Sequence, residues 1–246
     1  MLRTILALGF AVLYLIVGIP VLGIEYLIGK VNPYKRDISS LRMVQWALGV
    51  VNRICGVKTT VIGHENIPTD QAVLYVANHN SIFDIVITYS LCPTLTGYIS
   101  KDDIEKIPLL NIWMRRLYCL FMKRDDMKQG VQVILEGIEQ VKKGISMCIF
   151  PEGTRGDSEE MIPFKNGSLK IAEKTGCPII PIAISNTRHI LEDHIPRVEP
   201  THVIVQYGTP IYPKELSKEE KKALASTTQN AIQKMLDRAK EPDFTY

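Results

Sequence analysis

The sequence predicts an α/β protein with a mixed, largely parallel β-sheet covered by helices, preceded by an N-terminal membrane-associated helical segment. Two observations carry this prediction. From residue 56 onward, short apolar runs rich in β-branched residues alternate with helical patterns. Before that, residues 4–24 contain no charged side chain. A chain of 246 residues with 46% hydrophobic residues suits one domain with a substantial core and an appendage.

The uncharged segment 4–24 is about 30 Å long as a helix, which matches the hydrocarbon thickness of a bilayer. A signal peptide would have a shorter apolar region and a small-residue cleavage site, and a buried core helix rarely lacks polar positions on every face. A membrane-embedded helix is therefore favoured. Arg3 precedes it, and Lys30, Lys35 and Arg36 follow it. The positive-inside tendency places the rest of the chain on the cytoplasmic side of the cell membrane.

A polar break at residues 32–37 separates this helix from an amphipathic pattern over 39–55, where Leu41, Leu48 and Cys55 recur at helical spacing. The second helix either packs on the globular domain or lies on the bilayer surface. We expect residues 1–55 to be membrane-anchoring helices and residues 56–246 to be the globular domain.

Seven strands and five helices are predicted in the globular domain. A capping box from Ser217 to Glu220 marks the start of the last helix. The predicted strands are 57–63, 72–77, 96–100, 118–123, 145–150, 178–184 and 202–208, and the predicted helices are 82–91, 103–116, 127–143, 165–175 and 217–239.

Composition excludes some classes of protein. The net charge is only +3, and no basic run is interleaved with aromatic residues, so nucleic acid is not expected as a partner. The five cysteines are well separated and form no CxxC pair. We expect them to be small buried residues in a reducing compartment rather than a metal site or a disulfide framework.

His79 and Asp84 follow an apolar run in the stretch "VANHNSIFD". If a helix begins near Ser81, this spacing brings the carboxylate back to the imidazole across the first turn. The aspartate would fix the tautomer, and the free ring nitrogen would take a proton from a substrate hydroxyl. By spacing alone, a structural histidine at the end of a strand is the commoner case, and the catalytic role stays one alternative. A Ser81 nucleophile is disfavoured because no G-x-S-x-G motif is present.

The stretch "CIFPEGTRG" ends another apolar run in a turn. Gly153 lets backbone N–H groups approach a ligand, while Thr154 and Arg155 offer a hydroxyl and a forked guanidinium, a combination that suits phosphate. The turn is not a P-loop. Alone, it could equally be a surface turn in which Glu152 pairs with Arg155.

Two further clusters are weaker. Lys101 sits at a strand exit and Arg124 follows another apolar strand. In "CPIIPIAI", Pro181 within a strand predicts an edge strand or a bulge.

Together and in this order, "NHNSIFD", "K…IP…MKR", "FPEGTRG" and "IIPIAI" resemble the four motifs of the glycerolipid acyltransferase family, and most closely those of bacterial 1-acylglycerol-3-phosphate acyltransferases. The resemblance covers roughly residues 57–210, including "PFKNGSLKIA". It departs from the family at Asn111 and Tyr118, where glycine is common, so the second motif is the weakest match.

The resemblance implies roles for particular residues. His79 would be the general base and Asp84 would orient it. Phosphate binding would fall to residues of the second and third motifs, and the fourth motif would be associated with the acyl donor. The implied phosphate-binding residues would be Lys101, Arg124, Glu152, Gly153, Thr154 and Arg155, and the implied donor-region residues would be Ile180 and Pro181.

The implied reaction is acyl transfer from acyl-CoA or acyl-carrier protein to lysophosphatidic acid in the membrane, giving phosphatidic acid. No metal and no further cofactor are expected. Glycerol 3-phosphate or another lysophospholipid is the nearest alternative acceptor. A non-catalytic lipid-binding protein of the same fold and a hydrolase are the alternatives from other classes.

Overall fold

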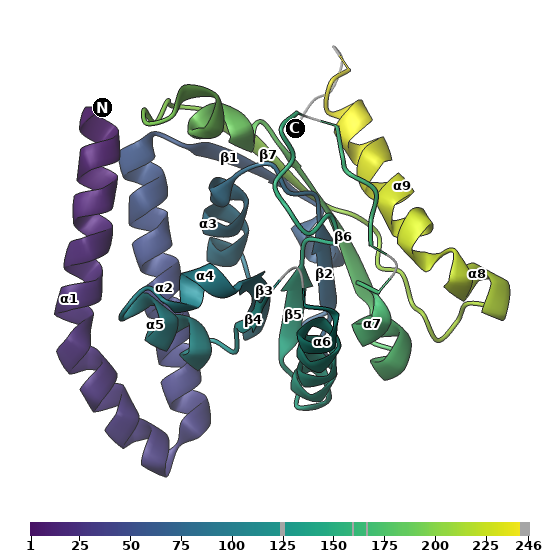
Figure 1. The fold of residues 1–246 in the computed structure, drawn as a ribbon, viewed down its shortest axis with the longest axis horizontal. Helices are drawn as coiled ribbons and strands as arrows, with labels where there is room; N and C mark the ends of the chain where they lie inside the picture. The colour runs from purple at the N-terminus through teal and green to yellow at the C-terminus, as the bar shows by residue number, and fades with distance from the viewer. Residues whose placement is uncertain (124–125, 159, 166, 242–246) are drawn as a thin grey trace.

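A computed structural model describes residues 1–123, 126–158, 160–165 and 167–241 (Figure 1). Its centre is one sheet with the strand order β1-β7-β6-β2-β5-β3-β4. All seven predicted strands are confirmed, with ends that shift by at most two residues. The strands are β1 Lys58–Ile62, β2 Leu74–Ala77, β3 Thr96–Lys101, β4 Leu120–Met122, β5 Ser146–Ile149, β6 Ile179–Ser185 and β7 His202–Tyr207.

The helices of the described residues cover both faces of this sheet (Figure 1). They are α1 Leu2–Val31, α2 Pro33–Cys55, α3 Ile82–Ser90, α4 Asp102–Glu105, α5 Leu110–Arg116, α6 Met127–Lys142, α7 Lys170–Thr175, α8 Lys218–Lys222 and α9 Leu224–Arg238, with the 3₁₀ turns η1 His64–Asn66, η2 Thr187–Ile190 and η3 Glu192–His194.

Every pair of neighbouring strands is parallel except β6 and β7. This arrangement confirms the predicted mixed, largely parallel sheet. The central strand β2 is buried along its whole length, and its alternate side chains feed two cores. Tyr75 and Ala77 belong to the core beneath α2 and α3, whereas Leu74 and Val76 belong to the core beneath α6, α7 and α9.

The prediction that Pro181 lies on an edge strand or in a bulge is wrong, because β6 lies between β7 and β2. The missing N–H is tolerated at the end of a ladder. The antiparallel pairing with β7 begins only at Ile182, opposite Tyr207. The Pro181 carbonyl accepts a hydrogen bond from Gly208 N just beyond β7, so the proline nitrogen faces the same side, where the strand has ended.

The N-terminal helices form a hairpin whose turn is tighter than predicted. The expected polar break over 32–37 shrinks to Asn32, and the second helix starts at Pro33 rather than near residue 39. Asn32 caps this helix by accepting a hydrogen bond from Lys35 N at 3.0 Å. Proline fits the first helical position because the N–H that it lacks would have no partner there.

The sequence left open where α2 lies, and the structure places it on the globular domain. Leu41 and Cys55 are fully buried in the core that also holds β2 and α3. Residues 1–55 and 56–246 therefore share one hydrophobic core. All five cysteines are buried without disulfides, as expected.

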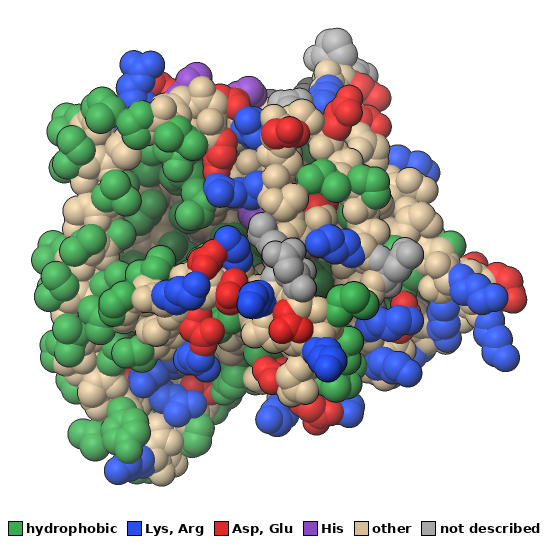
Figure 2. All heavy atoms as spheres, viewed as in Figure 1, with side chains coloured by type: hydrophobic (Ala, Val, Ile, Leu, Met, Phe, Trp, Pro, Cys, Tyr) green, Lys and Arg blue, Asp and Glu red, His purple; other side chains and the backbone are tan. Residues whose placement is uncertain are grey.

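Helix α1 packs against α2 and leaves its other face open. It is the one helix among the described residues that is long and apolar enough to cross a membrane, by length and composition. Figure 2 shows hydrophobic side chains along the α1 side of this view, while charged side chains gather over its middle and opposite side. The exposed apolar residues of α1 include Leu6, Leu13, Ile16 and Leu27.

Polar contacts join the N-terminal hairpin to Arg116, at the end of α5, and to Tyr118. The carboxylate of Glu25, only 2% exposed, accepts hydrogen bonds from Ser40 Oγ at 2.6 Å and Arg116 Nη1 at 2.9 Å. The hydroxyl of Tyr118 donates to Asp37. Tyr118 has a φ of 61°, the left-handed region that favours glycine, which accounts for the glycine common at this position in the resembling family.

Three predicted helices differ in their boundaries. The helix expected over 103–116 is split into α4 and α5, because Pro108 cannot continue it. The helix expected over 165–175 is confined to α7, and the one over 217–239 is divided at Ala223 into α8 and α9. The capping box of Ser217 and Glu220 is confirmed.

We expect Arg116→Ala to lower the free energy of unfolding by about 3–5 kcal/mol, because it leaves the buried Glu25 carboxylate without its cation. Arg115→Ala is the matched control. The Arg115 side chain is 63% exposed and pairs with Glu105, so its loss should cost under about 1 kcal/mol. Denaturant unfolding in detergent measures both values. Equal effects of the two substitutions would contradict a stabilising role for the Glu25 pair.

Candidate active site

The candidate site lies where β2, β3, β4 and β5 end, at the carboxyl edge of the parallel part of the sheet. This is the edge at which open α/β sheets bind ligands. A cavity of about 520 Å³ opens there, with an apolar wall and several cations. Its lining includes His79, Ile82, Ile85, Ile99, Lys101, Ile104, Met122, Lys123, Phe150, Gly153, Thr154, Arg155 and Lys165.

His79 and Asp84 form the pair that their spacing predicted. His79 follows β2, and Asp84 lies in the first turn of α3, so the turn returns the carboxylate to the ring. Nδ1 of His79 is 2.9 Å from Oδ2 of Asp84. The carboxylate can only accept, so Nδ1 carries the proton and Nε2 keeps its lone pair. The ring of Phe150 stacks on the imidazole at 4.1 Å between centroids.

Asp84 is fully buried, yet both of its oxygens are satisfied. Oδ2 also accepts hydrogen bonds from Asn80 N at 2.7 Å and Ser81 N at 2.8 Å, and Oδ1 accepts one from the hydroxyl of Thr187. Ser81 and Asp84 form a capping box at the start of α3. The aspartate that orients the imidazole therefore also fixes the backbone of the loop that carries it.

The loop after β2 is joined to the turn after β5 by two hydrogen bonds. His79 N donates to Oε1 of Glu152 at 2.7 Å, and Gly156 N donates to the His79 carbonyl at 2.8 Å. On the other side, the side-chain amide of Asn78 exchanges two hydrogen bonds with the backbone of Ile184 in β6. Asn78 thus continues the sheet pairing while the chain leaves the strand.

Glu152 lies behind this loop rather than in the cavity. It is 2% exposed, and its second oxygen accepts a hydrogen bond from Ile162 N at 2.8 Å. Burial raises the pKa of Glu152, and the two backbone hydrogen bonds oppose that shift. Its observed contacts hold backbone in place, so they differ from the phosphate contact that the family resemblance implied for it.

Four described cations line the cavity. Lys101 pairs with Asp103, and Arg155 Nη1 is 3.0 Å from Oε1 of Glu192. Lys123 and Lys165 have no ion-pair partner among the described residues. Gly153 has a φ of 75°, and a Cβ there would lie 2.5 Å from Lys165 Nζ, so glycine gives the lysine chain room to cross the turn.

The structure brings together most of the predicted site residues, but not all. Lys101, Gly153, Thr154 and Arg155 share one cavity with His79. Ile180 is fully buried inside the sheet, and Pro181 is paired with Val76 of β2; neither lines the cavity. Their link to the acyl donor stays a prediction. Arg124 lies outside the described residues.

Sequence reasoning missed four residues at the site. Phe150 and Lys165 lie in the motif stretches "CIFPEGTRG" and "PFKNGSLKIA", so local sequence could have suggested them. Thr187 and Glu192 had no such signal, because their contacts with Asp84 and Ser81 span 103 and 111 residues of chain.

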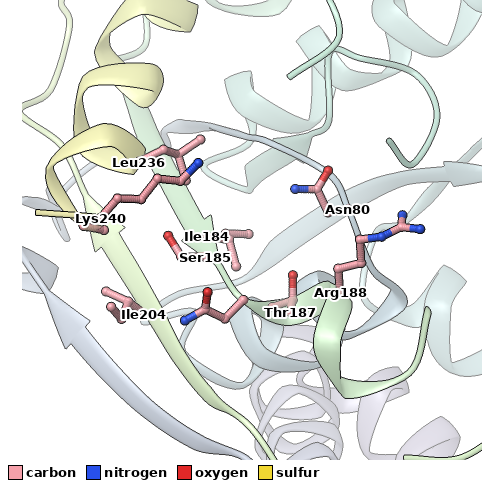
Figure 3. A pocket seen from close by; sticks show the side chains of 10 residues that line it. Asn80, Ile184, Ser185, Thr187, Arg188, Ile204, Leu236 and Lys240 are labelled. Carbon is pink, nitrogen blue, oxygen red and sulfur yellow. The ribbon is translucent and has the colours of Figure 1, made fainter. Parts of the chain in front are cut away.

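The loop between β2 and α3, residues 78–81, is called the catalytic loop. A second, smaller hollow of about 80 Å³ lies on another side of this loop, where β6 ends near the last turn of α9. Figure 3 shows Asn80, Thr187 and Arg188 around it, with Leu236 and Lys240 of the C-terminal region opposite. Among the described residues, no group of three or more His, Cys, Asp or Glu side chains could hold a metal ion.

The raised pKa of Glu152 gives a prediction for stability against pH. Folding disfavours the ionised carboxylate, so its contribution to stability is fully present below its unfolded pKa of about 4.3 and is lost as pH rises through the folded value. Glutamine does not titrate. The unfolding free energy of the wild type minus that of Glu152→Gln should therefore fall as pH rises through this window, measured by denaturant titration at matched pH values. A difference that grows with pH would contradict the direction of the shift.

Comparison with known proteins agrees with this geometry. A family model described as Acyltransferase matches residues 58–185. A 1-acyl-sn-glycerol-3-phosphate acyltransferase of Borreliella burgdorferi is 31% identical over 189 residues, which is 76% of this chain and 75% of that protein. The chloroplastic 1-acyl-sn-glycerol-3-phosphate acyltransferase BAT2 of Brassica napus is 39% identical over 135 residues, and the match spans 54% of this chain but only 39% of the longer plant protein.

A solved structure resembles the whole chain. The crystal structure of the 1-acyl-sn-glycerophosphate (LPA) acyltransferase PlsC from Thermotoga maritima superposes with a TM-score of 0.86 at 28% identity, covering 100% of this chain and 97% of that one. The family model covers the strands and loops that carry His79, Asp84 and Arg155. The chain therefore belongs to the acyltransferase family that includes the 1-acyl-sn-glycerol-3-phosphate acyltransferases.

Proposed function

We propose that the protein transfers a fatty acyl group from an acyl thioester to the free hydroxyl of 1-acylglycerol 3-phosphate, giving phosphatidic acid for phospholipid synthesis. One observation carries the proposal: the histidine paired with a buried carboxylate lines the same cavity as Lys101, Arg155 and Lys165. A base and a set of cations in one cavity suit an alcohol that carries a phosphate. The names of the relatives support the same acceptor.

The chemistry follows from the two nitrogens of the imidazole. Nε2 of His79 takes the proton of the acceptor hydroxyl as its oxygen attacks the thioester carbonyl. The new C–O bond forms and the C–S bond breaks, and the proton passes to the departing thiolate. The Asp84 contact at Nδ1 stabilises the imidazolium that forms between the two steps. The apolar wall formed by Ile82, Ile85 and Ile99 suits the acyl chains.

The charged groups of the site give the acceptor its orientation. Arg155 presents a planar fork of N–H donors, and only Nη1 is engaged by Glu192. Thr154 adds a hydroxyl at the same turn. Lys165 crosses the same turn at Gly153, and Lys101 adds positive charge from the end of β3. These contacts support a phosphate position near the turn after β5, with the glycerol hydroxyl directed toward His79.

We further propose that the α1 face lies in the membrane at its cytoplasmic side. Because α2 packs on the domain and α1 packs on α2, the hairpin suits insertion into one leaflet. The acceptor and product are both membrane lipids, and leaving the bilayer costs about 0.8 kcal/mol for each exposed methylene. A site held at the bilayer surface spares both lipids that cost.

His79→Ala should lower kcat by about 10²–10⁴-fold, because the imidazole that Asp84 orients is lost. Asp126 also lines the cavity, but its carboxylate caps α6 by accepting a hydrogen bond from Gln129 N. Asp84→Asn should lower kcat by a similar or smaller factor. One amide oxygen cannot accept all four hydrogen bonds that the Asp84 carboxylate accepts, but the imidazole itself is still present. Circular dichroism and thermal unfolding check that each variant is folded. Near wild-type turnover by a folded His79→Ala protein would refute this mechanism.

The acceptor is tested with purified protein and oleoyl-CoA or oleoyl-acyl-carrier protein, offered lysophosphatidic acid and glycerol 3-phosphate separately, with products resolved by mass. We expect phosphatidic acid from lysophosphatidic acid.

Arg155→Ala should raise the KM for lysophosphatidic acid about tenfold or more, because a charge-assisted hydrogen bond is lost, and should change the KM for the acyl donor less. Release of free fatty acid without acceptor would favour a hydrolase, and a defect confined to the donor would remove Arg155 from the phosphate site.

The membrane proposal is tested by placing a charge on the open face of α1. Leu13 is 58% exposed, so Leu13→Asp should leave the fold intact but weaken liposome binding about tenfold or more. Leu135→Asp on α6 is the matched control, because Leu135 is 51% exposed. Liposome sedimentation compares the two. Equal binding by the wild type and Leu13→Asp would show that this face does not contact the bilayer.

A further inference from the structure

The segment that follows β6 contacts the candidate site from outside the region that the family model matches. That match ends at residue 185, and the 3₁₀ turns η2 and η3 begin at Thr187. Three of its side chains contact the site. The Thr187 hydroxyl donates a hydrogen bond to Asp84, and Arg188 Nη1 donates one to the Gly156 carbonyl at 2.8 Å. Glu192 contacts both Ser81, just before α3, and Arg155, in the turn after β5. Figure 3 shows Thr187 and Arg188 beside Asn80 of the catalytic loop.

Glu192 makes the largest set of these contacts. Its Oε2 accepts a hydrogen bond from Ser81 Oγ at 2.6 Å, and its Oε1 accepts from Ile82 N at 2.9 Å. Oε1 also accepts from Arg155 Nη1 at 3.0 Å. One carboxylate therefore joins the N-terminus of α3, which carries Asp84, to the arginine of the turn after β5.

The two partners of this ion pair differ in exposure. The side chain of Glu192 is 9% exposed, whereas that of Arg155 is 51% exposed. An exposed arginine on a turn has many rotamers and loses that freedom when it binds a ligand. Fixing one guanidinium nitrogen removes part of that cost and leaves the other donors of the fork available.

A carboxylate near a phosphate site would repel the ligand if its charge were uncompensated. Here the negative charge of Glu192 is matched by the Arg155 guanidinium and by the backbone N–H at the start of α3. The geometry thus allows Glu192 to hold the arginine without placing a free negative charge in the cavity.

We propose that Glu192 is a positioning residue for the acceptor: it orients Arg155 toward the acceptor phosphate and fixes the start of α3. This inference rests on the proposed function, because it takes a phosphate-bearing acceptor as the ligand of Arg155. It adds a residue from beyond the matched motifs to the set that determines recognition of the acceptor.

The test is a double-mutant cycle with Glu192→Ala, Arg155→Ala and the combined variant, using lysophosphatidic acid and oleoyl-CoA. Glu192→Ala should raise the KM for the acceptor about tenfold and change the KM for the donor less than about twofold. In the Arg155→Ala background it should raise the acceptor KM no further. Glu192→Gln should recover part of the loss, since its amide oxygen can still accept from Arg155.

Glu139→Ala is the matched control, because Glu139 is 59% exposed, pairs with Lys142 on α6 and does not line the cavity. If Glu192→Ala lowers kcat both in the wild type and in Arg155→Ala, the fall reflects loss of the contacts with Ser81 and Ile82, and supports the second part of the proposal, that Glu192 fixes the start of α3. The positioning of Arg155 is overturned if Glu192→Ala keeps the wild-type acceptor KM, or raises it equally in both backgrounds.

Failure of the proposed acceptor gives a different result. If the wild type acylates glycerol 3-phosphate but not lysophosphatidic acid, the proposed function is wrong in its acceptor. The same variants then test Glu192 with glycerol 3-phosphate, because both acceptors present a phosphate monoester to Arg155.

Discussion

The buried carboxylate of Asp84 is the group on which the rest of the site depends. It accepts hydrogen bonds from the His79 ring, from the backbone of Asn80 and Ser81, and from the hydroxyl of Thr187. A buried charge is tolerable only when donors surround it. The hydrogen bonds that stabilise the buried Asp84 carboxylate therefore also hold the imidazole, the loop before α3 and the first turn of α3 in one arrangement.

The same logic links the site to the turn after β5. Glu152 is buried and does not line the cavity, and its carboxylate accepts hydrogen bonds from the backbone of His79 and Ile162. Two motifs that lie 73 residues apart in sequence are therefore one structural unit. A motif residue can be required for activity because it holds another residue in position. Glu152 has this role toward the His79 backbone, whereas Arg155 lines the cavity itself.

The N-terminal hairpin is part of this body rather than a removable anchor. Leu41 and Cys55 fill the core beneath the sheet, and Glu25 pairs with Arg116 in the segment that leads to β4. Removing residues 1–55 would expose this core, so loss of activity in a truncated protein would reflect unfolding as well as loss of membrane contact. Substitutions on the open face of α1 separate the two effects.

Sequence alone determined the strands, their largely parallel pairing and the pairing of His79 with Asp84. These follow from short-range patterns: apolar β-branched runs, and a helix start that returns residue 84 to residue 79. It also determined that the cysteines are buried, because their neighbours are apolar. The order of the motifs identified the family, and the first three of them lie where β2, β3 and β5 end at one edge of the sheet.

Only the tertiary structure decided which motif residues face the cavity. Glu152 and Arg155 lie in one turn, yet one is buried and the other is half exposed, and local sequence gives no sign of this difference. The interior place of Pro181 depends on where β7 ends, and the packing of α2 depends on the shape of the sheet. Thr187 and Glu192 reach the site across more than 100 residues of chain, because contacts between distant segments are set by the fold and not by any spacing along the sequence.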